Sequence, residues 1–150
     1  MDAIKLLIVD PNDCFTRSAR HYLASWSIVE NIDTTGNLST GLKMARLNKP
    51  DILLIDDLYF KDDDDTLHRK LKELKSECPG LEIIALTLYE ENIKPANLLI
   101  RQNTCRIIAK ENFAQGLARE LKKYKPQYQN KNPGGTEERK CPGKIYPDRP

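Results

Sequence analysis

The sequence predicts an α/β fold in which a doubly wound parallel sheet of five strands carries five helices. Two observations predict it. Short, almost entirely apolar runs alternate with longer segments whose apolar residues recur every three or four positions. The short runs are typical of parallel strands that are buried on both faces, and the longer segments are typical of amphipathic helices. Their regular alternation predicts a parallel sheet connected by crossover helices.

Each predicted strand is a short run rich in Ile, Leu or Val. Such β-branched and leucine-rich runs, bounded by polar or turn-forming residues, favour extended structure. In chain order, the predicted strands span Ile4–Val9, Ile28–Asp33, Asp51–Asp56, Leu81–Thr87 and Cys105–Ala109.

The five predicted helices follow the strands, each with an apolar face. Asp13 and Asn37 are the expected N-caps of the first two helices, because a short polar side chain there accepts a backbone N–H. Residues 48–50 and the pair Pro79-Gly80 are expected to end the second and third helices. The expected apolar faces contain Phe15, Ala19, Tyr22, Leu23 and Trp26; Leu38, Leu42 and Ala45; Leu67, Leu71, Leu74 and Cys78; Ile93, Ala96, Leu99 and Ile100; and Phe113, Leu117, Leu121 and Tyr124.

The 150 residues suggest one domain, residues 1–125, followed by a change in composition. Residues 126–150 contain five of the nine prolines and three of the seven glycines, which predicts a flexible Pro/Gly-rich tail. The net charge of +2 comes from this tail, which holds five basic and three acidic residues. Since no dense basic face is present, we expect no direct DNA binding.

The four cysteines are widely scattered and form no C-x-x-C pair. That pattern favours reduced thiols over disulfides or a zinc site, and it predicts a cytoplasmic protein. No apolar run approaches the roughly 18 residues that a membrane span requires, so no membrane association is expected.

Four polar residues come at the ends of predicted strands. Asp10 and Asp56 close the first and third strands, Thr87 closes the fourth, and Lys110 follows the fifth. In a doubly wound sheet the carboxyl ends of the strands form the ligand-binding edge, so these side chains are predicted to converge. Two acids, a hydroxyl and an amine are the groups that a phosphoryl-accepting aspartate requires.

The order and spacing of these motifs resemble the receiver domain of two-component response regulators, over about residues 3 to 124. The matching strings are Leu6-Leu7-Ile8-Val9-Asp10, Pro50-Asp51-Ile52-Leu53-Leu54-Ile55-Asp56, Ala85-Leu86-Thr87 and Ile107-Ile108-Ala109-Lys110. The resemblance implies a flavodoxin-like sheet with strand order 2-1-3-4-5.

The resemblance also implies roles for the site residues. Asp56 would accept a phosphoryl group from a histidine kinase or phosphotransfer protein, and Thr87 and Lys110 would contact that group. Mg²⁺ would be held by Asp10, Asp56 and the backbone carbonyl of Leu58.

Such a domain signals to a downstream protein partner through helix four, strand five and helix five, a surface that can also form a homodimer. It receives a phosphoryl group and is not otherwise an enzyme. Leu58 and Tyr89 occupy the two positions that control water access, and their bulk predicts slow self-hydrolysis of the phosphoryl group.

Several residues depart from the family pattern. Pro11 stands where receivers carry a second acid, which weakens the expected magnesium site. Glu111 replaces a common proline, and Ile107 stands where an aromatic residue often swings inward. These departures support an alternative hypothesis, a pseudo-receiver that binds partners without phosphorylation. A small flavodoxin-like enzyme is a third hypothesis, but the chain offers no Cys–His or Ser–His pair at strand ends and no glycine-rich phosphate loop.

Overall fold

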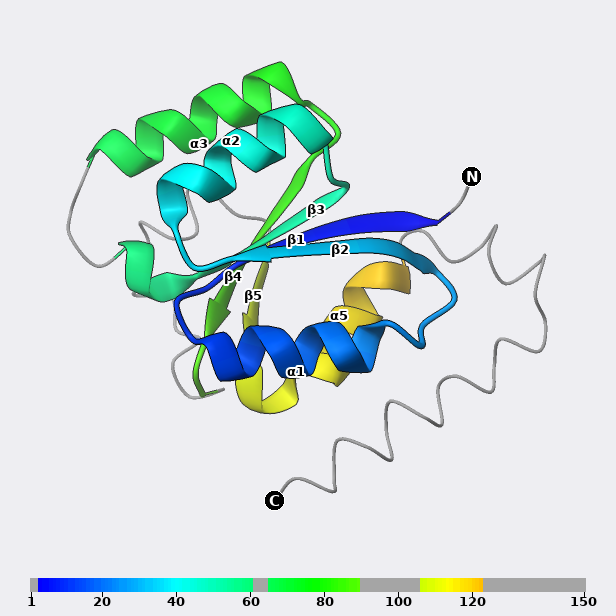
Figure 1. Cartoon of the computed structure of the whole chain (residues 1–150). Coiled ribbons are helices and arrows are strands. Elements are labelled where there is room, and N and C mark those ends of the chain that lie inside the picture. The colour runs from blue at the N-terminus through cyan, green and yellow to red at the C-terminus, as the bar shows by residue number, and fades with distance from the viewer. Residues whose placement is uncertain (1–2, 61–64, 90–105, 123–150) are drawn as a thin grey trace.

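The computed structural model describes residues 3–60, 65–89 and 106–122 (Figure 1). These residues form a five-stranded sheet in the order β2-β1-β3-β4-β5, and every strand pair is parallel. The predicted sheet is therefore confirmed. The strands are β1 Ile4–Val9, β2 Val29–Thr35, β3 Ile52–Asp56, β4 Glu82–Thr87 and β5 Arg106–Ala109.

β2 ends two residues later than the sequence predicted. Thr34 and Thr35 pair with Ile8 and Val9 of β1, which extends the ladder beyond Asp33. Threonine is β-branched and favours strands, but it is polar. The apolar pattern therefore ended before the strand did.

Helices cover both faces of the sheet (Figure 1). α1 and α5 lie on one face, and α2 and α3 lie on the other. None of the described helices is long and apolar enough to cross a membrane. The predicted fourth helix through Ile93, Tyr124 of the fifth helix, and the tail 126–150 lie outside the described residues. The described helices are α1 Asp13–Leu23, α2 Leu38–Asn48, α3 Asp65–Glu77 and α5 Phe113–Leu121, and short 3-10 turns lie at Asp57–Phe60 (η1) and Lys110–Asn112 (η3).

Successive residues of β1 face opposite layers, as the alternation of side chains along a strand requires. Leu6 and Ile8 are buried among residues of α1 and α5. Leu7 and Val9 are buried among residues of α2 and α3. Both faces of β1 are thus apolar, which leaves the strand end as the place for polar chemistry.

The structure corrects the predicted cap of α1. Asn12, not Asp13, is the N-cap: its side chain accepts the N–H of Phe15 at 3.1 Å. Asp13 is the first helical residue and pairs with Arg17 at 3.0 Å. The extended backbone at Asn12, with φ −84° and ψ 100°, is the conformation that an N-cap adopts. The predicted cap of α2 is confirmed, because Asn37 accepts the N–H of Thr40 at 2.8 Å.

Helix ends also differ slightly from the predicted apolar faces. α1 ends at Leu23, so Trp26 lies beyond the helix, although its side chain is buried as expected. α2 ends at Asn48, and Lys49 adopts a left-handed backbone with φ 47° before Pro50. Pro cannot donate a backbone hydrogen bond and disfavours a helical conformation in the residue before it, which explains the stop.

Candidate functional site

Sheet topology brings the four predicted site residues to one edge. β1 and β3 are neighbours, so Asp10, which follows β1, lies beside Asp56, the last residue of β3. Thr87 is the last residue of β4 and pairs with Ala109 of β5. Lys110 comes directly after that partner. The four residues therefore occupy the carboxyl edge of four adjacent strands, as the sequence predicted.

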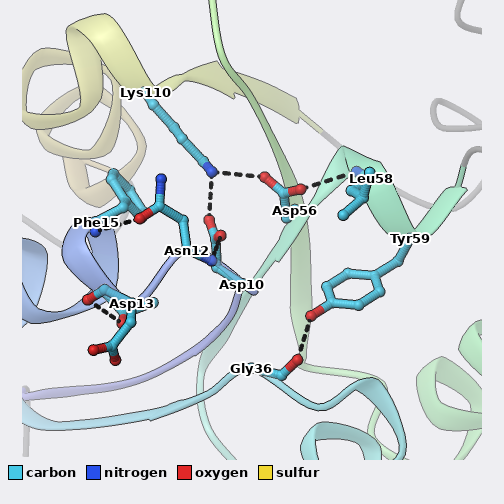
Figure 2. Close-up of polar contacts among 10 residues, drawn as sticks. Asp10, Asn12, Asp13, Phe15, Gly36, Asp56, Leu58, Tyr59 and Lys110 are labelled. Carbon is cyan, nitrogen blue, oxygen red and sulfur yellow. Dashed lines mark hydrogen bonds and ion pairs between the residues drawn. The ribbon is translucent and has the colours of Figure 1, made fainter.

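The ammonium group of Lys110 joins the two acids (Figure 2). Its Nζ lies 2.7 Å from Oδ2 of Asp10 and 2.8 Å from Oδ1 of Asp56. All three side chains are largely buried: relative exposures are 0%, 10% and 11% for Asp10, Asp56 and Lys110. Ion pairs between buried side chains form charge-assisted hydrogen bonds and are screened little by water.

Backbone N–H groups satisfy the remaining carboxylate oxygens (Figure 2). Oδ1 of Asp10 accepts the N–H of Asn12 at 2.8 Å. Oδ2 of Asp56 accepts the N–H of Leu58 at 3.0 Å, and this donor is presented by the η1 turn. Each acid thus accepts one backbone N–H and one ammonium contact, so its orientation is fixed by two elements at once.

Burial and neighbouring charge shift the ionisation of the site. Burial raises the pKa of Asp10, and the charge of Asp56 raises it further, while Lys110 and the Asn12 N–H lower it only in part. Burial alone would lower the pKa of Lys110, but its contacts with Asp10 and Asp56 outweigh that effect and raise it. Lys110 is therefore a permanent cation facing two acids.

Thr87 lies at the same edge without joining the ion pairs. Its side chain is 1% exposed, and its hydroxyl oxygen makes no hydrogen bond to any described residue. Burial of a hydroxyl without a hydrogen-bond partner lowers the stability of the fold. This hydroxyl can therefore donate a hydrogen bond to an anionic group that enters the site.

Two aromatic residues of the site were not predicted from the sequence. The Phe15 ring lies 4.8 Å from Nζ of Lys110, measured to the ring centroid. The Tyr59 hydroxyl donates to the carbonyl of Gly36 at 2.7 Å, which ties η1 to the loop after β2 (Figure 2). Burial raises the pKa of Tyr59, and the charges of Asp10 and Asp56 add to the effect. Helical spacing had identified Phe15 only as a core residue, and no sequence signal connected Tyr59 with a loop 23 positions away.

The two carboxylates of the site have the chemistry to hold Mg²⁺. The described residues contain no cluster of three or more His, Cys, Asp or Glu side chains that could hold a metal. Mg²⁺ often binds through one or two carboxylates and keeps several waters, and carboxylate oxygens can accept more than one contact. Asp10 and Asp56 therefore fit Mg²⁺ as a two-carboxylate site. Pro11, which is exposed, supplies no third acid.

The two residues predicted to control water access lie beside this edge. Leu58 is 43% exposed and Tyr89 is 48% exposed, and both follow a strand that ends at the site. Leu88, next to Tyr89, is 51% exposed. None of these three side chains carries a carboxylate or an amide that could orient a water molecule.

Comparison with known proteins identifies the fold. No family model matches the sequence, and no curated protein matches it. A response regulator receiver domain protein from Clostridium thermocellum has 20% identity and a TM-score of 0.61, over 84% of this chain and 97% of that one. The receiver domain of AraT from Geobacillus stearothermophilus has 20% identity and a TM-score of 0.60, over 87% and 98%.

A third neighbour was solved with a phosphate mimic. It is the isolated receiver domain of RcsB from Salmonella enterica serovar Typhimurium in the presence of BeF3⁻, with 18% identity and a TM-score of 0.60 over 80% of this chain and 89% of that one. These likenesses establish that the chain has the receiver fold, as its strand order and strand-end residues had predicted.

Proposed function

We propose that this chain is a phosphoacceptor receiver in which Asp56 takes a phosphoryl group from a histidine kinase or phosphotransfer protein. One observation carries the proposal: the Asp56 carboxylate lies at a strand end between the Lys110 ammonium and the Leu58 N–H. Those two donors hold a nucleophilic oxygen in a fixed orientation, and both can also stabilise the charge of a transferred phosphoryl group.

The proposed reaction is a phosphoryl transfer between two side chains. A carboxylate oxygen of Asp56 attacks phosphorus, so that an O–P bond forms and the P–N bond of the donor phosphohistidine breaks. The imidazole leaves with the electron pair and takes up a proton. The product is an acyl phosphate, an established covalent form of aspartate. Lys110 contacts the new phosphoryl oxygens as a point charge, and the Thr87 hydroxyl donates a hydrogen bond to them.

Mg²⁺ would be held by Asp10, Asp56 and the backbone carbonyl of Leu58. When bound, it supplies positive charge that offsets the negative phosphoryl oxygens. Because Pro11 removes one acid, we expect weaker metal binding than in a site with three carboxylates. Lys110 weakens it further, since its ammonium already contacts both acids and competes with a metal cation for their oxygens.

The acyl phosphate is expected to hydrolyse slowly. Leu58 and Tyr89 border the site and are both bulky, so neither a carboxylate nor an amide orients an attacking water there. A phosphoprotein lifetime of seconds, measured by the decay of the adduct mass, would contradict this expectation.

The proposed output is a protein partner rather than DNA. Lys110 begins η3, which leads directly into α5, so a displaced ammonium acts on the β5–α5 surface. On that surface Arg106 pairs with the buried Glu120. A phosphoryl group adds about −1.5 to −2 charge, which can bias two pre-existing arrangements of such a surface. The partner, or a second copy of the chain, would bind there, in the cytoplasm.

A pseudo-receiver is the second candidate function. It is favoured by the ion pairs themselves, because Lys110 already neutralises the acid pair without any added ligand. Pro11 and the partly buried Ile107, in place of an acid and an aromatic residue, point in the same direction.

Intact mass spectrometry distinguishes the two functions. The protein is incubated with acetyl phosphate and Mg²⁺, and the wild type is compared with Asp56→Asn. Asp51→Asn is the matched control, because Asp51 directly precedes β3 and accepts the Lys5 N–H at 2.9 Å. The proposal predicts one phosphoryl adduct on the wild type and on the control, and none on Asp56→Asn. No adduct on the wild type, together with no Mg²⁺ binding by calorimetric titration, would contradict the proposal and favour the pseudo-receiver.

A further inference from the structure

We propose that Phe15 is a positioning residue whose ring holds the Lys110 ammonium against the acid pair. The proposal deepens the proposed function and rests on it only for the consequence for phosphoryl transfer. The contact itself exists in the protein without a phosphoryl group.

The contact has the geometry of a cation–π interaction. Nζ of Lys110 lies 4.8 Å from the centroid of the Phe15 ring, within the roughly 6 Å over which the ring quadrupole attracts a cation. The Lys110 side chain is 11% exposed, and Phe15 is partly buried against the core. Because little water surrounds the ammonium, the attraction is stronger here than at an exposed site.

The ring is held in place from behind. Phe15 and Phe113 form an edge-to-face pair, with centroids 5.2 Å apart and an interplanar angle of 82°. Phe113 is 5% exposed and belongs to the core cluster between the sheet, α1 and α5. The Phe113 edge contact favours this orientation of the Phe15 ring, whereas an aliphatic side chain at position 15 would offer Lys110 no quadrupole.

Four contacts form a closed circuit through the loop between β1 and α1 (Figure 2). The Asn12 N–H binds Oδ1 of Asp10, and Oδ1 of Asn12 accepts the Phe15 N–H. The Phe15 ring contacts Lys110, and Lys110 returns to Oδ2 of Asp10. The N-cap of α1 therefore fixes both the acid and the ring that surround the same ammonium.

Pro11 favours the first hydrogen bond of this circuit, between Asn12 and Asp10. It has no N–H and a restricted φ, so the first backbone donor available to Asp10 after the strand is that of Asn12. The residue that replaces an acid thereby favours the turn that orients Asp10 and starts α1.

Positioning matters because lysine is a flexible side chain with a mobile charge. An ammonium confined by Asp10, Asp56 and the Phe15 ring loses little further freedom when it contacts a phosphoryl group on Asp56. Loss of the Phe15 ring would leave the charge of Lys110 unchanged but would let its ammonium group occupy a wider range of positions.

A double-mutant cycle measures the contact without any phosphodonor. The cycle combines Phe15→Leu with Lys110→Met, and urea denaturation gives the unfolding equilibrium constants. The proposal predicts a coupling of about threefold or more between the two sites, as expected for a partly desolvated cation–π pair. The control cycle of Trp26→Leu with Lys110→Met is expected to show coupling near onefold, because the Trp26 ring pairs with Tyr22 beyond the other end of α1.

A second measurement reads the ring directly. In protein with isotope-labelled lysine, the Lys110 Cε–H resonances carry an upfield ring-current shift, which Phe15→Leu abolishes and Phe15→Tyr restores. Phe15→Met replaces Phe15→Leu if the leucine variant does not fold. Onefold coupling and unchanged Lys110 resonances in the variant without a ring would overturn the proposal. Because both measurements omit phosphodonor, a failure of phosphotransfer leaves this result standing, and the reverse also holds.

Discussion

Among single residues, Asp10 combines complete burial of its carboxylate with two neighbouring charges. Its side chain is fully buried and lies beside a second acid, and one ammonium serves both. Burying a carboxylate disfavours its charged form, and the neighbouring carboxylate adds to that effect. Burial of these ionised groups lowers the free energy of unfolding, and charged groups in such positions are typical of functional sites.

The pH dependence of folding should reveal this conflict. The pKa of Asp10 in the folded chain is raised above its ordinary value of 3.8. As pH rises from that value through the raised pKa, the unfolded chain loses the proton first, so the free energy of unfolding falls across this window. Asp10→Asn cannot lose a proton, so its stability advantage over the wild type should grow with pH and persist at neutral pH.

Urea denaturation at pH 4 to pH 7 measures the effect, on the wild type, Asp10→Asn and the control Asp13→Asn. Lys110 stays charged throughout, because its pKa is also raised. Asp13 is exposed and its carboxylate pairs with Arg17 on the same helix, so its variant should show no such trend. An advantage of Asp10→Asn that is constant or shrinks with rising pH would contradict the prediction.

Among secondary-structure elements, the two capped helices differ in what their caps position. Asn12 and Asn37 each accept a backbone N–H at the start of a helix, but only Asn12 also contacts a site acid. One cap therefore stabilises a helix alone, and the other stabilises a helix and the site together.

Alanine substitution should separate these roles. Asn12→Ala and Asn37→Ala are each expected to lower the free energy of unfolding by about 1 kcal/mol, the usual value of an N-cap. Only Asn12→Ala should also change the Lys110 side-chain resonances, because its cap holds the Phe15 backbone. The measurements are urea denaturation and NMR of labelled lysine. A similar lysine change in Asn37→Ala would show that general loosening is responsible.

The packing of α2 on β1 also makes a prediction. A Cβ at Gly41 would lie 2.6 Å from Cγ2 of Val9, so the helix can approach the strand only without a side chain there. Overpacking costs about 1–3 kcal/mol, and alanine recovers about 1 kcal/mol of helix propensity. Gly41→Ala should therefore destabilise the domain by roughly 1 kcal/mol. Gly80→Ala, where nothing lies within 4 Å, should change stability by no more than about 0.5 kcal/mol in thermal or urea denaturation; equal effects would refute the packing argument.

Features that follow from local sequence patterns could be predicted, whereas features that depend on backbone geometry or on contacts between distant loops could not. Strands of continuous apolar residues and strand-end acids are local patterns, so the sheet and the convergence of Asp10, Asp56 and Lys110 were predictable. The cap of α1 was misplaced by one residue, because Asn12 and Asp13 are both capping types and backbone geometry decides between them. The Tyr59–Gly36 bond joins two loops through side-chain conformation, which no sequence period encodes.

In the whole molecule, the site lies where the described elements on both faces of the sheet meet its edge. η1 provides the Leu58 N–H, and α1 provides the Phe15 ring. Lys110 connects these groups with η3 and α5, since η3 begins at this residue and α5 begins at Phe113. A charge added at Asp56 would thus reach the last described helix through one side chain, Lys110.

The location of the phosphoryl group tests the central claim most directly. Protein treated with acetyl phosphate is reduced with borohydride, which converts an aspartyl phosphate to homoserine, and proteolytic peptides are sequenced by mass spectrometry. The proposed function predicts homoserine at position 56 alone, and none when phosphodonor is omitted. Phosphorylation of another residue, or no homoserine after treatment at saturating Mg²⁺, would contradict the assignment of Asp56 as the phosphoacceptor.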